Sequence, residues 1–139
     1  MPRKYLPSLS ELIDRLSINQ LKEVFIPEHK EEYAKEMKLI IHDINETLLE
    51  ISPAGEHPNN TIDAEFIRSV IVLAQMNLHI WHNESACRRG ENGGDLRLTH
   101  GLNGVRNVAK NKIEEKAGGR KDYKTDCLAA EFKDWEISW

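Results

Sequence analysis

Side chains able to bind ligands or move protons recur at helical spacing in the middle of the chain. Asn77, Trp81, Glu84 and Arg88 follow one another by four, three and four positions, so a helix places them on one face. Earlier in the same predicted helix, that face is apolar, with Phe66, Val70 and Ala74. The core-facing stripe therefore turns polar in its C-terminal half. Because an unpaired charge is costly to bury, we expect these four side chains to meet partners or a water-filled cleft.

Two other predicted helices carry polar residues beside their own apolar stripes. In the first helix, Asp14 lies on the side of Leu21 and Phe25, and Arg15 and Lys22 lie further round. In the fourth, Arg106 borders the apolar stripe, with Asn103 and Lys110 just beyond it. Arg120 and Lys121 follow in a turn that begins with two glycines. These residues complete a candidate set of twelve: Asp14, Arg15, Lys22, Asn77, Trp81, Glu84, Arg88, Asn103, Arg106, Lys110, Arg120 and Lys121.

This polar cluster has three interpretations, and all stay open from the sequence. In the first it is an internal network, in which Asp14 or Glu84 pairs with Arg88 or Arg106 and fixes the helix register. In the second the bundle opens at this end, and Arg88, Arg106, Lys110, Arg120 and Lys121 bind an anionic ligand. Arginine suits bidentate contacts to phosphate or carboxylate, and Trp81 is suited to stack on a planar group. A third interpretation is that the same surface binds a protein partner.

Other catalytic and metal-binding patterns are weak. His42 and Asp43 resemble the metal-binding step of helical phosphohydrolases, but both point away from the predicted apolar stripe. His79 and His82 lie on the outer side of their helix, with no third ligand at a suitable spacing. The acidic run from Glu28 to Glu36 is better interpreted as a solvated face. No glycine-rich phosphate loop or nucleophile elbow is present, so we expect no metal and no cofactor.

The elements that position these residues are all helical. Apolar residues spaced by three and four positions predict helices over 9–25, from Pro27 to 51, over 62–89 and over 95–117, and a shorter one over 122–135. Ser8 and Glu11 form a capping box before the first. Loops are expected at 52–60, at 90–94 and at the glycine pair Gly118-Gly119. We therefore predict an all-α fold, a small bundle of four to five helices, in a single domain over 1–139.

Composition narrows the class of protein. The chain has 139 residues, 30% charged and 40% hydrophobic, which is typical of a globular domain. It has two cysteines without metal-type spacing and no apolar run of the ~20 residues that a membrane span needs. These features predict a cytoplasmic protein without membrane contact. Residues 88–124 hold ten basic and five acidic side chains, too modest an excess, without clustered aromatics, to favour nucleic-acid binding.

The same motifs carry a family resemblance. The segment from Glu11 to Ile18 (ELIDRLSI), the row from Asn77 to Arg88 and a weaker motif from Leu102 to Lys110 resemble a loose group of small helical proteins. Large contractile-tailed phages and some bacteria encode this group. The resemblance implies a helical fold and a phage origin, hence a host-cell cytoplasmic location, and it implies no reaction.

The expected function is therefore a non-enzymatic binding or scaffold protein that uses the polar cluster to recognise an anionic small molecule or a protein partner. The third helix is apolar around most of its circumference between Phe66 and Trp81, so we also expect a homo-oligomer. The alternative is a small enzyme acting on a phosphorylated or nucleotide substrate, with Glu84 or Asp14 as general base.

Overall fold

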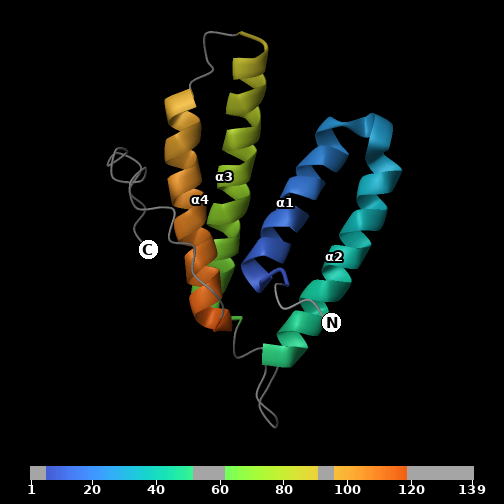
Figure 1. The fold of residues 1–139 in the computed structure, drawn as a ribbon, viewed down its shortest axis with the longest axis vertical. Helices are drawn as coiled ribbons and strands as arrows, with labels where there is room; N and C mark the ends of the chain where they lie inside the picture. The colour runs from blue at the N-terminus through green and yellow to red at the C-terminus, as the bar shows by residue number, and fades with distance from the viewer. Residues whose placement is uncertain (1–5, 52–61, 91–95, 119–139) are drawn as a thin grey trace.

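The computed structural model describes residues 6–51, 62–90 and 96–118, and all of its regular structure there is helical (Figure 1). Four α-helices, α1 (Leu9–Phe25), α2 (Lys30–Ile51), α3 (Ala64–Arg88) and α4 (Leu96–Ala117), account for most of these residues, and the short 3-10 helix η1 (Pro27–His29) joins α1 to α2. The predicted all-α small bundle is confirmed. The fifth helix predicted over 122–135 lies outside the described residues.

Local capping explains where the helices begin and end. Ser8 Oγ accepts a hydrogen bond from the backbone N–H of Glu11 at 3.4 Å, as the predicted capping box requires. Asp63 Oδ1 accepts from the N–H of Phe66 at 2.9 Å and caps α3 in the same way. Helix α4 stops at Gly118, whose φ of 71° is a left-handed conformation that favours glycine.

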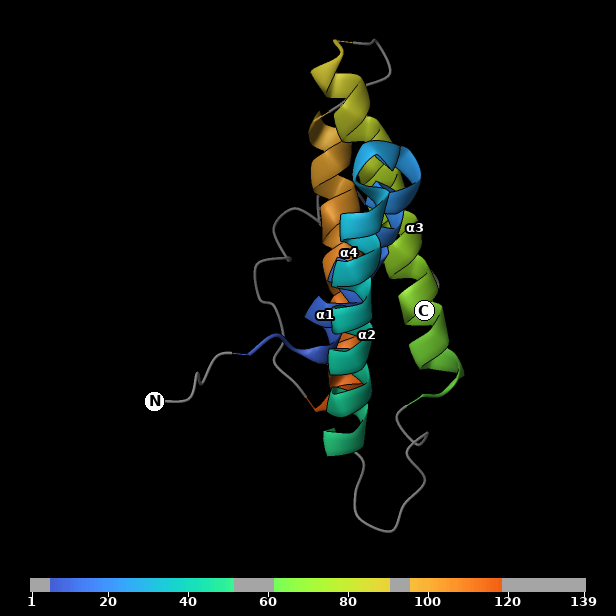
Figure 2. The ribbon, with the colours of Figure 1, turned by 90° about the vertical axis from the view of Figure 1, so that its right-hand side faces the viewer.

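The helices form two antiparallel hairpins, α1–α2 and α3–α4. The two members of each hairpin pack against each other, and α1 also packs on both α3 and α4 (Figures 1 and 2). The core lies where α1, α3 and α4 meet, and its most deeply buried side chains include Leu9, Leu73, Leu102 and Ile113. The predicted apolar stripe of the fourth helix is confirmed, because its members Leu98, Leu102, Val105, Ala109 and Ile113 all belong to this core or pack against it.

Helix α2 is less completely packed than the others. Its C-terminal residues Ile44, Leu48 and Ile51 contact the core. Among the described helices, none has the combination of length and apolar sequence needed to cross a bilayer.

Candidate functional site

An ion pair between α1 and α4 lies at the centre of the polar cluster. Arg106 donates from Nε to Oδ1 of Asp14 at 3.0 Å and from Nη2 to Oδ2. The guanidinium therefore binds the carboxylate in a bidentate manner, with two parallel hydrogen bonds. The Asp14 side chain is 8% exposed and that of Arg106 is 22% exposed. Water therefore screens the pair only partly, and each partner depends on the other for neutralisation.

Two asparagines and a serine extend this pair into a network that spans three helices. Asn77 of α3 donates from Nδ2 to Oδ1 of Asp14 at 2.9 Å and to Oγ of Ser17 at 3.3 Å. Asn103 Oδ1 accepts from Nη1 of Arg106 at 3.3 Å. The Asp14 carboxylate thus accepts three hydrogen bonds, and the predicted pairing of Asp14 with Arg106 across two helices is present. The network fixes how α1 sits on α3 and α4.

The prediction that Asn77, Trp81, Glu84 and Arg88 all point inwards is wrong in part. Asn77 is buried, Trp81 and Glu84 are half-buried, and Arg88 is exposed. The reason is that α1 ends at Phe25, whose ring stacks on Trp81 with centroids 6.1 Å apart. Helix α3 continues beyond that point (Figure 1), so its last turns have no α1 to face.

The remaining predicted residues do not gather into one site. Arg15 is exposed, and the Lys22 ammonium lies 5.8 Å from the centre of the Tyr33 ring. Lys110 is half-buried fourteen positions into α4, about 20 Å along the helix from the end nearest Arg88. Arg120 and Lys121 lie outside the described residues. The expected grouping of Arg88 with Arg106 and Lys110 is therefore not found.

Glu114 is a buried polar residue that the sequence prediction missed. It is 2% exposed, and its Oε1 accepts the backbone N–H of Ser10 at 2.7 Å. The first N–H groups of a helix have no partner within that helix, and a carboxylate beside them is favourable. Oε2 is also buried and has no hydrogen-bond donor among the described residues. Its sequence signal is its position four residues after Lys110, in the polar row of α4 that includes Arg106.

A second ion pair joins the start of α3 to the end of α4 near the surface. Lys116 Nζ donates to Asp63 Oδ2 at 2.6 Å and lies 3.1 Å from Glu65 Oε2. The hydrogen bond from Lys116, followed by that from the N–H of Phe66, lowers the pKa of Asp63 below its ordinary value. The hydrogen bonds to Asp63 and Glu65 raise the pKa of Lys116. This contact places the end of α4 directly beside the first turn of α3.

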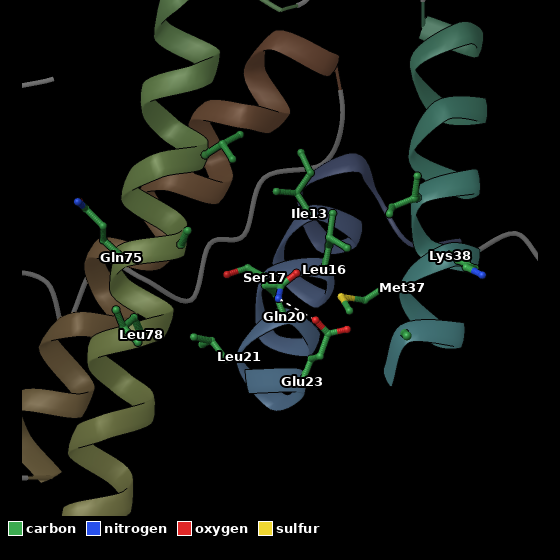
Figure 3. Close-up of a pocket in the computed structure, with 14 residues that line it drawn as sticks. Ile13, Leu16, Ser17, Gln20, Leu21, Glu23, Met37, Lys38, Gln75 and Leu78 are labelled. Carbon is green, nitrogen blue, oxygen red and sulfur yellow. Dashed lines mark hydrogen bonds between the residues drawn. The ribbon is translucent and has the colours of Figure 1, made fainter. Parts of the chain in front are cut away.

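An apolar groove of about 740 Å³ lies among α1, α2 and α3, and we call it the α2–α3 groove. Helix α1 forms its floor, and α2 and α3 form its walls (Figure 3). The apolar lining residues are Ile13, Leu16 and Leu21 from α1, Ala34, Met37 and Ile41 from α2, and Val70, Ala74 and Leu78 from α3. Its polar lining residues are Ser17, Gln20, Glu23, Lys38 and Gln75.

The groove accounts for part of the apolar breadth of α3 that the sequence analysis noted. Val70, Ala74 and Leu78 line the groove, and Val70 also packs against the core. No group of three or more metal-ligating side chains lies together within residues 6–51, 62–90 and 96–118.

No protein-family model, no curated protein and no solved structure matches this chain. The resemblance to small phage-encoded helical proteins stays a prediction.

Proposed function

We propose that the protein is a binding or scaffold protein that receives an amphipathic helix in the α2–α3 groove. The observation that carries the proposal is the groove itself, with a volume of about 740 Å³ and apolar side chains from three helices. Ligand sites are concave and mostly apolar with a few polar groups at their edges. A helix laid into such a groove buries apolar residues spaced by three and four positions.

The dimensions of the groove suit two to three turns of a helix. Its α3 wall runs from Val70 to Leu78, about 12 Å along the helix axis. Ile41 on the opposite wall is 46% exposed, so its side chain is accessible to an incoming residue. Met37, one turn earlier on α2, is only 8% exposed and lies at the base of the groove.

The polar network serves this function indirectly. Asp14 already accepts hydrogen bonds from Arg106 and Asn77, so an anionic ligand at Arg106 would have to displace a buried carboxylate. The same contacts leave Asp14 poorly placed as a general base, which reduces the support for a small enzyme acting on a phosphorylated substrate. We assign the network the role of holding α1, the floor of the groove, against α3 and α4.

Site-specific photocrosslinking tests the proposal. A photoreactive amino acid at Ile41, inside the groove, is compared with one at Leu39, which is 69% exposed and not part of the groove lining. In cells that express the full chain, we expect Ile41 to give a defined intermolecular adduct whose cross-linked peptide has an apolar helical stripe, and Leu39 to give none. Equal labelling from both positions, or an adduct that persists after Ala74→Glu, an exposed position in the groove lining, would refute the proposal.

A further inference from the structure

We propose that in the free protein the α2–α3 groove is occupied by the chain's own C-terminal segment, residues 122–139, docked as a helix parallel to α3. This inference rests on the proposed function in one respect, since it names a segment that competes with a partner for the same groove. It can be tested on the purified protein without any partner. Three independent features support it: a row on α3, a matching row in the segment, and the position at which α4 ends.

The row on α3 is apolar and faces outwards. Ile67 and Ile71 are 52% and 51% exposed, and with Ala74 and Leu78 they are spaced by four, three and four, so they follow one face of the helix. The last two residues line the groove, and the first two continue the row towards the start of α3. Contiguous exposed apolar surface of this kind marks a contact with another element.

The C-terminal segment carries a row with the same spacing. Leu128, Phe132, Trp135 and Trp139 are also separated by four, three and four positions. The first three lie within 122–135, where the sequence predicts a helix, and Trp139 lies one turn beyond it. The chain has three Phe, three Tyr and three Trp, and four of these nine aromatics lie between residues 119 and 139. Burial of this many large apolar side chains against protein would stabilise a docked segment.

The end of α4 directs the chain towards this face. The contact between Lys116 and Asp63 places the last turn of α4 beside the start of α3, and the left-handed Gly118 turns the chain away from the α4 axis. From Ala117 to Asp122 the chain spans at most about 17 Å. That length is close to two interhelix separations of 8–10 Å, enough to pass the start of α3 and reach its far side.

If residues 122–139 form a helix that starts beside the first turn of α3, its apolar row aligns with the apolar row on α3. If Asp122 lies level with the residues just before α3, Leu128 lies level with Ile67, Phe132 with Ile71, Trp135 with Ala74 and Trp139 with Leu78. Both rows then extend about 17 Å. The large Trp135 ring falls opposite Ala74, where the small side chain leaves room for it. The four-residue linker also gives the segment a high effective concentration at its own groove, which favours docking within one chain over exchange between copies.

Hydrogen exchange measured by mass spectrometry on the full chain tests the inference, with Ile41→Glu and Leu39→Glu as a matched pair. A glutamate at Ile41 would place a charge inside the occupied groove, whereas Leu39 lies outside the groove lining. We expect amides of 122–139 to be protected in the parent protein and in Leu39→Glu, and to exchange at least about tenfold faster in Ile41→Glu. Unchanged protection around Leu73 and Leu102 serves as the check that the core remains folded.

A second pair of variants leaves the described helices intact. Replacing both Phe132 and Trp135 with alanine should expose the groove and raise the fluorescence of an added apolar dye several-fold, whereas Asp134→Ala, on the opposite side of the predicted helix, should not. The inference is wrong if 122–139 exchanges at the unprotected rate in the parent protein, or if Ile41→Glu and Leu39→Glu behave alike. It is also wrong if the protection of 122–139 rises with protein concentration in parallel with a dimer mass in light scattering, because the segment would then dock on a second copy.

The two proposals fail in different ways. If residues 122–139 are unprotected while the Ile41 photocrosslink to a partner is present, the C-terminal segment does not occupy the groove and the proposed function stands. If the segment is protected by the groove and no partner adduct forms even in the Phe132, Trp135 double variant, the segment is a permanent part of the fold. The groove is then not a partner site.

Discussion

Replacing Arg106 with leucine should destabilise the protein by about 3–5 kcal/mol, because it leaves a buried carboxylate without its counter-charge. Asp14 has an 8% exposed side chain and accepts three hydrogen bonds, two of them from Arg106. After the substitution, only Asn77 still donates to it. The loss is a large fraction of the roughly 5–15 kcal/mol that stabilises a typical domain, so measurements are best made at low temperature.

Urea unfolding followed by circular dichroism measures this loss. With a denaturant slope of about 2 kcal/mol per molar, the expected loss lowers the unfolding midpoint by about 1.5–2.5 M. Arg15→Leu is the matched control, because Arg15 lies exposed on α1 and its removal should change stability by less than about 0.5 kcal/mol. Replacing Asp14 and Arg106 together with leucine should recover most of the loss, since a buried ion pair and an apolar pair of similar size differ little in stability.

The reasoning fails if Arg106→Leu costs less than about 1 kcal/mol, which is the range of exposed ion pairs. It also fails if the double variant is as unstable as the sum of the two single variants, because the two side chains would then contribute independently. Either result would mean that water reaches Asp14 and that the network does not fix the helix register.

Three further predictions concern the core, the start of α1 and the surface ion pair. Leu73→Ala, at a fully buried position, should cost about 2–5 kcal/mol by leaving a cavity, measured by thermal or urea unfolding. Glu114→Ala should cost about 1–3 kcal/mol because it leaves the Ser10 N–H without its acceptor; in the same assay, full stability would show that water replaces the carboxylate. The lowered pKa of Asp63 means that its contribution is present above its ordinary pKa of about 4 and is lost as the pH falls through the folded value. The stability difference between the parent protein and Asp63→Asn should therefore shrink below about pH 4, and salt should weaken it at neutral pH because Lys116 and Asp63 are partly exposed.

The sequence predicts the helices well because each depends on local signals. The predicted first helix, 9–25, has the observed bounds, and Ser8 caps it as expected. The apolar stripe of α4 follows from spacing alone, since a helix with one apolar face has one way to bury it. The predicted start at Pro27 is occupied by a 3-10 turn before α2 begins at Lys30, a difference of one turn.

The candidate site is predicted only where it lies deep in the bundle. Asp14, Asn77 and Arg106 form the network because their faces meet near the centre, where all three helices are present. The prediction that Arg88 points inwards is wrong because its burial depends on how far α1 extends alongside α3. The spacing of residues within α3 carries no information about the length of α1. The groove likewise depends on the angle between the two hairpins. That angle is set by packing between helices distant in the sequence, so no local pattern reveals it.

The contact between Ser10 and Glu114 has a consequence for the order in which the protein folds on the ribosome. These residues are 104 positions apart, whereas α1 has its hairpin partner α2 immediately after it. During synthesis the first hairpin therefore emerges and pairs while the backbone N–H of Ser10 can bond only to water, and the carboxylate that it needs is among the last described residues to leave the exit tunnel. A chain stopped before Glu114 is made should pair α1 with α2 but leave the backbone N–H of Ser10 without this acceptor.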